Sequence, residues 1–279
     1  NNRLFIAAYG LEGELQPEVP EDLITLARAD AKKDMAAFLS YAVGCMMGRY
    51  SLDKPGLILA DAGDTLEQYL AKVGKSKAQL KFQPDDDGIL PVMDVEWFED
   101  DIVSRLEAFL VATFGADKLT ENIQFIEKSL GAEIRSYFLS GFYKDHLQTY
   151  KKRPIYWMAQ SPKKAFCAFI YLHRYTKDTL SLLLNSYLRP YIVKLNARIE
   201  ILAQTEASAG SAREKTAARK ELEKLRKYVR ECEEWERDVL LPAAQSRIEF
   251  DLDDGVKVNY LKLGDVLTPI PGLATKDEE

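Results

Sequence analysis

The residues best suited to chemistry lie in a basic segment that spans residues 144–177. This segment holds eight Lys or Arg residues against a single acid, Asp145, and it contains both histidines of the chain. Clustered cations attract phosphate groups through electrostatics, while aromatic rings and arginine forks can contact bases. The composition therefore favours nucleic-acid binding, although charged runs also occur on ordinary solvated surfaces.

The cations and aromatic residues of the basic segment define the candidate DNA contacts. Tyr156 and His173 are candidates for contacts with bases or sugars. Trp157 lies in the same run, where a large aromatic residue among apolar neighbours is expected in the core. We expect phosphate contacts from six residues: Lys151, Lys152, Arg153, Lys163, Lys164 and Arg174.

The overall charge of the chain hides this basic segment. With 38 basic and 44 acidic residues the formal charge is −6, which alone argues against a nucleic-acid binder. Residues 1–120 carry −9, residues 121–230 carry +11 and residues 231–279 carry −8. A basic block between acidic ends is typical of a polyanion-binding face.

Other kinds of chemistry have little support in the sequence. The chain has no glycine-rich nucleotide loop and no G-x-S-x-G motif. Ser161 and Lys164 match an S-x-x-K pattern only within an expected turn. Cys167 and His173 are better explained by a buried strand than by a thiol–imidazole pair. The sequence therefore predicts no catalytic residue and no metal site.

The cysteines and the hydropathy of the chain limit which classes of protein it can belong to. Cys45, Cys167 and Cys232 lie far apart, without a CxxC pair or a Cys/His cluster, so a zinc site of the usual spacing is not expected. Each lies among apolar or helical residues, which indicates free buried thiols in a reducing compartment. No apolar run reaches the roughly 18–20 residues of a membrane helix. We therefore expect a cytoplasmic protein that contacts no membrane.

A short β-hairpin is expected to position the basic residues. Two apolar and aromatic runs, at residues 154–158 and 165–172, flank a Ser-Pro-Lys-Lys turn. Such runs around a turn indicate a two-stranded hairpin with basic residues at its ends. Upstream, Asp94 is a candidate N-cap. Apolar spacings of three and four predict helices at residues 27–47, 94–114, 120–130 and 133–149.

Two long amphipathic patterns follow the hairpin. Apolar stripes at residues 180–202 and 218–239 are separated by a turn at 206–211, where Ser211 and Glu214 match a capping box. Together they predict an antiparallel helical hairpin over about residues 179–245. Proline at position 190 should kink the first helix or divide it in two.

The tail of the chain returns to a strand pattern. Residues 248–252 and 256–260 alternate in the two-residue period around Asp253-Asp254-Gly255, which predicts a β-hairpin within residues 247–262. The fold class expected from all these elements is mainly α with small β-hairpins, an α+β arrangement. It runs from a helical N-terminal part through the basic hairpin and the long helical hairpin to the C-terminal β-hairpin.

Several longer stretches of sequence resemble a known family of bacterial enzymes. These stretches are residues 2–6, 9–11, 17–20, 41–53, 142–147, 150–157, 161–163, 171–175 and 253–260. They are similar to the region that follows the catalytic domain in large adenine-specific DNA methyltransferases, and most specifically to the C-terminal half of the PglX methyltransferases of BREX phage-defence systems. The resemblance runs from about residue 2 to residue 273.

This resemblance implies an enzyme that transfers a methyl group from S-adenosylmethionine to adenine in a specific DNA sequence. The family's Asn-Pro-Pro-Tyr tetrapeptide and glycine-rich cofactor loop are absent, so no catalytic residue can be carried over. The chain also begins without methionine, and we expect it to be one piece of such an enzyme. No cofactor is expected in this segment, because S-adenosylmethionine is expected in the catalytic domain.

By resemblance, residues 1–140 are a helical linker or scaffold region and residues 141–279 are the target-recognition region. The latter includes the helical spacer and the C-terminal hairpin, and its expected partner is double-stranded DNA. The alternative is a protein-interaction scaffold, in which the helical hairpin holds other BREX proteins and the acidic N-terminal part is a docking surface.

Overall fold

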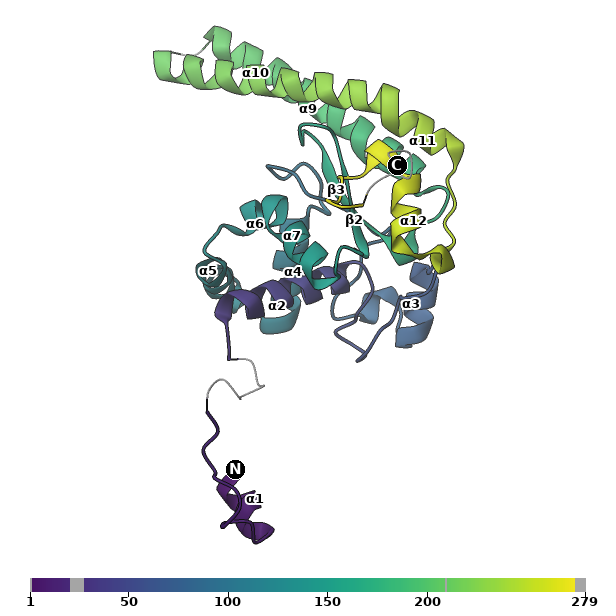
Figure 1. Cartoon of the computed structure of the whole chain (residues 1–279). Helices are drawn as coiled ribbons and strands as arrows, with labels where there is room; N and C mark the ends of the chain where they lie inside the picture. Colours follow the sequence, from purple (N-terminus) through teal and green to yellow (C-terminus); the bar gives the residue numbers. More distant parts are fainter. Residues whose placement is uncertain (1, 21–27, 209, 274–279) are drawn as a thin grey trace.

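A three-stranded antiparallel sheet lies at the centre of the molecule, with helices on both of its faces (Figure 1). The computed structural model describes residues 2–20, 28–208 and 210–273. Strands β2 (Tyr156–Gln160) and β3 (Cys167–Tyr171) form the predicted hairpin, with Trp157 opposite Ile170. The third strand, β1 (Ile89–Pro91), was not predicted and pairs with the free edge of β3.

The sheet is buried on both faces, because alternate side chains enter two separate cores. One core contains Trp157 and Ile170 and is closed by the helices that follow the sheet in sequence. The other contains Tyr156 and Phe169 and is closed by the helices that precede β2. Strands on either side of residue 140 therefore belong to one sheet, while the division of the chain into two functional regions at that point stays a prediction.

The helices before the sheet form the second core. The helix expected over residues 94–114 begins only at Ile102, because Asp101 rather than Asp94 caps it by accepting a hydrogen bond from the Val103 amide. The helix expected over 133–149 is divided at Gly141. Residue 27, the expected start of the first predicted helix, lies outside the described residues. The helices are α1 (Asn2–Ala8), α2 (Ala31–Met46), α3 (Leu66–Val73), α4 (Ile102–Phe114), α5 (Leu119–Leu130), α6 (Ile134–Ser140) and α7 (Phe142–Thr149).

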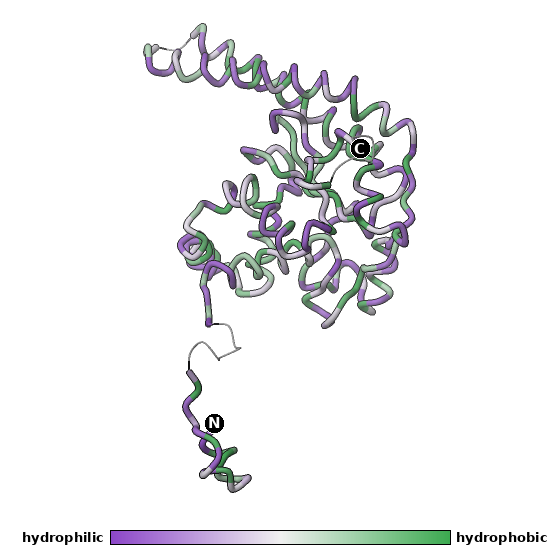
Figure 2. The backbone as a smooth tube through the Cα atoms, in the orientation of Figure 1, coloured by the Kyte–Doolittle hydropathy of each residue, from purple (hydrophilic) through white to green (hydrophobic). Residues whose placement is uncertain are grey.

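The predicted antiparallel helical hairpin is confirmed as α9 (Arg189–Ser208) and α10 (Ala212–Trp235), which project together beyond the sheet (Figures 1 and 2). The Ser211 hydroxyl caps α10 by accepting a hydrogen bond from the Glu214 amide. Pro190 is the second residue of α9, which continues from a π-helical segment, Leu183–Leu188, so the first helix is irregular where a kink or a division was expected. Residue 209 lies outside the described part. The hairpin is flanked by α8 (Thr179–Leu182), a second π-helical segment (Glu236–Leu240) and α11 (Leu241–Ser246).

The predicted C-terminal β-hairpin over residues 247–262 is wrong. The segment forms a 3-10 turn (Leu252–Asp254) and a helix, α12 (Gly255–Lys262). Local bonds favour this turn, because Asp251 accepts hydrogen bonds from the Asp253 amide through its carboxylate and from Asn259 through its carbonyl. Alternating runs of five residues are too short to distinguish a strand from other buried segments. The tail still reaches the sheet, through a bridge between Ala159 and Leu267, a hydrogen bond from the Thr268 amide to the Met158 carbonyl and packing of Tyr260 against Trp157.

The observed fold class is mainly α with a small antiparallel sheet, as predicted. Cys45, Cys167 and Cys232 are free and buried, which confirms that expectation. None of the helices in the described ranges is both long and apolar enough to cross a membrane.

Candidate nucleic-acid interface

The β2–β3 hairpin separates the predicted phosphate contacts into two groups. Lys151, Lys152 and Arg153 lie before β2, whereas Lys163 and Lys164 lie in the turn at its other end. At about 3.4 Å per residue, the five residues of β2 alone extend about 17 Å. All five cations are exposed, but the structure does not bring them into one cluster.

The first group follows α7 in an unusual backbone conformation. Lys151 and Lys152 have φ angles of 50° and 61°, in the left-handed region that residues with a Cβ rarely occupy. The Lys152 amide bonds the Leu147 carbonyl at 2.7 Å, which closes the turn after the helix. The Lys152 amine reaches the Pro271 carbonyl at 2.8 Å. Packing of the surrounding chain thus holds these cations at a fixed position.

The second group is held by one carboxylate of α10. Oε1 of Glu231 accepts hydrogen bonds from the Ser161 hydroxyl at 2.6 Å, the Lys163 amide at 2.7 Å and the Ala165 amide at 3.2 Å. Lys164, with a φ of 67°, closes the turn by donating its amide to the Ser161 carbonyl at 2.9 Å. The turn that carries the two lysines is therefore attached to the helical hairpin.

This attachment places Lys163 beside two cations that the sequence analysis missed. Lys163, Lys227 and Arg230 line one groove of about 510 Å³, together with the carboxylates of Glu231, Glu234 and Asp238. Within the described residues, none of the three cations forms an ion pair, whereas Asp238 is paired with Arg237. The net positive charge of residues 121–230 includes Lys227 and Arg230. The spacing of apolar residues, however, identifies only the buried face of α10 and not the exposed one.

The remaining predicted contacts lie inside the fold. Tyr156 is 1% exposed and packs against the His146 ring, and burial raises its pKa well above the usual value. Arg174 is 6% exposed and donates to the carbonyls of Asp85 and Asp86 at 2.7 and 2.6 Å. His173 is half-buried, and burial lowers its pKa. These side chains therefore stabilise the fold and do not form part of an exposed surface.

His146 is a structural residue that was not among the predicted contacts. Its Nε2 accepts hydrogen bonds from the amides of Ile155 and Tyr156 at 3.1 and 3.2 Å, where β2 begins. Burial, together with the nearby Arg49 charge, lowers the pKa of His146 to about 3. The neutral imidazole is therefore the form that the fold requires.

Acidic residues gather beside the start of β1. Tyr187 lies 2.8 Å from Asp100 Oδ2 and 3.0 Å from Asp87 Oδ2, at a cavity of about 590 Å³ that Arg105 and Lys194 also line. Burial and the neighbouring Asp85 charge raise the pKa of Asp87 to about 8. A protonated Asp87 removes one negative charge from this cluster. Across the described ranges, no three His, Cys, Asp or Glu side chains are arranged to hold a metal ion.

Comparison with known proteins identifies what the chain resembles. No family model matches it. It is 41% identical over 274 residues to the adenine-specific methyltransferase BrxX of Escherichia coli O9:H4 (strain HS), which covers 92% of this chain and 22% of the relative. It is 35% identical over 283 residues to the adenine-specific methyltransferase PglX of Lacticaseibacillus casei (strain Zhang), which covers 96% of this chain and 23% of the relative. The chain thus spans less than a quarter of these relatives' length, and over nearly all of its own length it is homologous to one segment of the BrxX and PglX adenine-specific methyltransferases.

Proposed function

We propose that this chain is the DNA target-recognition portion of a site-specific adenine methyltransferase of a BREX phage-defence system. Such an enzyme transfers a methyl group from S-adenosylmethionine to adenine. The cofactor and the catalytic residues are assigned to another part of that enzyme, because the sequence here has neither the Asn-Pro-Pro-Tyr tetrapeptide nor the glycine-rich loop. The described residues supply the surface that holds DNA.

One observation carries the proposal: the turn between β2 and β3 presents exposed cations from a fixed backbone. Glu231 anchors the turn through its backbone and Ser161, which leaves the amines of Lys163 and Lys164 directed to their surroundings without an acidic partner among the described residues. Phosphate contacts fix the register and orientation of a protein on the duplex before any base is read. A rigid cationic turn suits that task.

The salt dependence of DNA binding tests the proposal. Fluorescence anisotropy of the 279-residue chain with a labelled duplex should show log Kobs falling linearly with log salt between about 50 and 200 mM, since bound cations release counterions. The double variant Lys163→Ala/Lys164→Asn should reduce the magnitude of the slope by about 1.8, or 0.9 per lost phosphate contact. Asparagine is chosen at position 164 because it tolerates the positive φ.

A matched pair of exposed lysines serves as the control. Lys128→Ala/Lys257→Ala removes the same charge from α5 and α12, at positions without an acidic partner in the described chain, and should leave the slope within about 0.3 of the original. The proposal fails if the chain does not bind duplex DNA at about 50 mM salt, or if both double variants change the slope equally.

The second candidate is a scaffold that docks other BREX proteins. Val193 and Ile201, which are 68% and 55% exposed on α9, favour this reading because they expose apolar surface eight residues apart. A chain that binds no DNA at low salt, but loses self-association or partner binding when Val193 and Ile201 become serine, would support the scaffold instead.

A further inference from the structure

A line of cations runs along α10 from the β2–β3 turn to the tip of the helical hairpin. Arg213, Lys220 and Lys227 are spaced by seven residues, which is close to two helical turns, so they lie on one side of the helix. At 1.5 Å per residue each step is about 10.5 Å, and the line is about 21 Å long. We call these three residues the α10 line.

Unlike Arg219 and Lys224, the three cations of the α10 line have no acidic partner in the described chain, and the same is true of Lys215, Arg226 and Arg230. Arg219 pairs with Glu223 at 3.5 Å, and Lys224 pairs with Asp94 at 2.5 Å. Arg213, Lys220 and Lys227 are exposed and form no ion pair in the part of the chain that is described. Their charge is therefore available to an anion from outside the chain.

The α10 line ends at the groove beside the β2–β3 turn. Lys227 lines the same groove as Lys163 and Arg230, so this end of the line lies beside the anchored turn. Lys163 and Arg230 thus lie beside the end of the α10 line, in a groove that also holds the carboxylates of Glu231, Glu234 and Asp238.

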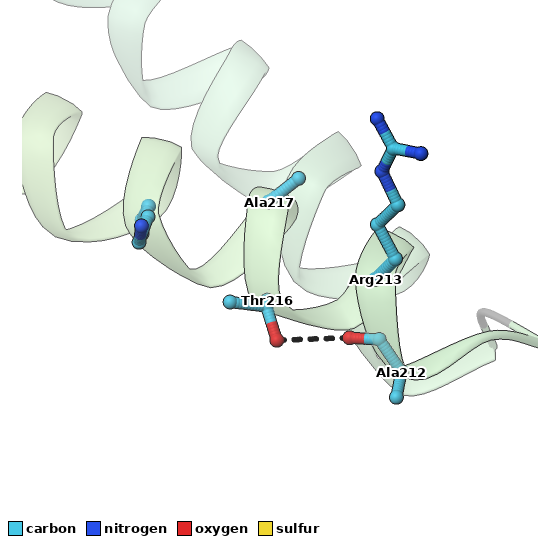
Figure 3. A pocket seen from close by; sticks show the side chains of 5 residues that line it. Ala212, Arg213, Thr216 and Ala217 are labelled. Carbon is cyan, nitrogen blue, oxygen red and sulfur yellow. Dashed lines mark hydrogen bonds between the residues drawn. The ribbon is translucent and has the colours of Figure 1, made fainter.

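The surface between the cations allows close approach. Arg213 and Lys220 flank a shallow hollow of about 470 Å³ that is otherwise lined by small residues, Ala212, Thr216 and Ala217. Figure 3 shows the Arg213 side chain extending away from the helix, and the Thr216 hydroxyl bonded back to the Ala212 carbonyl at 2.8 Å. No bulky side chain in the hollow keeps a partner away from the helix backbone.

The α10 line is carried by the helical hairpin of α9 and α10, whose two helices pack against each other. Leu195 and Leu202 of α9 are buried with Leu222 and Leu225 of α10 in the first core. Because the two helices support each other, the spacing of the Cα atoms that carry the cations is fixed. Cations that converge on a point suit a small anion, whereas cations fixed in a line suit an extended polyanion with regularly repeated charge.

We propose that the α10 line is a phosphate-contacting surface, which extends the DNA contact from the β2–β3 turn along the helical hairpin. The occupant is the sugar–phosphate backbone of a duplex, which carries one negative charge per about 1.7 Å of helix axis. The proposal rests on the DNA binding inferred above and adds the helical hairpin to the surface that contacts the nucleic acid. The hairpin is then a binding arm as well as a spacer.

The test compares two triple variants of the same helix in the full 279-residue chain. Arg213→Ala/Lys220→Ala/Lys227→Ala removes the α10 line. Lys215→Ala/Arg219→Ala/Arg226→Ala removes three exposed cations from another side of α10, and it serves as the control because it loses the same formal charge and Lys and Arg have similar helix propensities. Circular dichroism and thermal melting check that both variants fold.

The readout is the slope of log Kobs against log salt for a labelled duplex of about 25 base pairs. Removal of the α10 line should reduce the magnitude of the slope by about 2.7, or 0.9 for each contact, while the control should change it by less than about 0.5. The inference is overturned if the two triple variants behave alike, or if removal of the α10 line has no effect while Lys163→Ala/Lys164→Asn still does. Absence of DNA binding by the unaltered chain would instead remove the proposed function, and this inference with it.

Discussion

Glu231 and Ser161, 70 residues apart in sequence, are joined by a 2.6 Å hydrogen bond from the Ser161 hydroxyl to Oε1 of Glu231. The same oxygen accepts the amides of Lys163 and Ala165, so one carboxylate of α10 satisfies three donors of the β2–β3 turn. Hydrogen bonds to a charged acceptor are among the stronger ones in proteins. The orientation of the cationic turn thus depends on the helical hairpin.

Glu231→Ala should lower the free energy of unfolding by about 2–3 kcal/mol, because it leaves these turn donors without their charged acceptor. Glu231→Gln keeps an oxygen at the position and should cost about 1 kcal/mol. Urea denaturation measures both. Glu233→Ala, an exposed neighbour, should stay within about 0.5 kcal/mol. Equal stability of Glu231→Ala and the unaltered chain would contradict the anchoring role.

The positive φ of Lys151 predicts different results for two substitutions that remove the same charge. Lys151→Gly should keep the free energy of unfolding within about 1 kcal/mol, because glycine adopts a φ of 50° without strain. Lys151→Val should be less stable than Lys151→Gly by about 1–2 kcal/mol, since a branched Cβ is poorly tolerated there. Denaturation curves of the pair test this, and indistinguishable midpoints would show that the left-handed turn is not maintained in solution.

His146 predicts how stability depends on pH. Above about pH 6.5 the imidazole is neutral in both the folded and the unfolded chain. Below that value the unfolded chain takes up a proton, whereas in the fold the pKa of His146 is lowered to about 3, so stability falls as the pH falls. This residue alone should contribute about 1.4 kcal/mol per pH unit between about pH 6 and pH 4.

The matched variant for this effect is His146→Asn, which has no titrating group. Unfolding free energies at several pH values should show that the difference between the unaltered chain and the variant shrinks as the pH is lowered. A difference that stays constant from pH 7 to pH 4 would contradict the assignment of His146 as a neutral acceptor.

The close packing around Gly44 predicts that the second core does not tolerate a side chain at this position. A Cβ at this position would collide with the Tyr50 ring, 2.7 Å from its Cε2 atom, and would lie 3.2 Å from the Tyr156 hydroxyl. Gly44→Ala should therefore destabilise the chain by about 1–3 kcal/mol. Gly210→Ala is the control, because nothing lies within 4 Å of a Cβ there, and it should change stability by less than about 0.5 kcal/mol. Thermal melting of the two variants distinguishes the cases.

The elements predicted correctly are those whose apolar pattern is long or whose turn is chemically specific. The helical hairpin of α9 and α10 has apolar stripes over more than twenty residues each, and the strands β2 and β3 flank a clear turn. Strand β1 has only three residues, so it offers no period to detect. The C-terminal segment has an alternating pattern, but hydrogen bonds of Asp251 favour a turn and a helix instead.

The candidate site was predictable in composition but not in geometry. Charge identified the exposed lysines of the two hairpin ends, yet it could not show that Arg174 and Tyr156 are buried. A two-sided sheet buries alternate residues on both faces, so polar or aromatic character does not identify an exposed face. Lys163 lines the same groove as Lys227 because Glu231 accepts a hydrogen bond from its amide. Lys163 and Glu231 are far apart in sequence, so no local spacing of residues indicates this arrangement.

The pairing of β1 with β3 has a consequence for how such segments can be exchanged between enzymes. A fragment that starts after residue 140 would contain β2 and β3 but leave the backbone groups opposite Ile89, Leu90 and Pro91 without partners. Unpaired strand edges promote aggregation. An exchange of this segment between related chains should therefore transfer residues 89–91 together with the β2–β3 hairpin, so that the joint falls upstream of β1 rather than at residue 140.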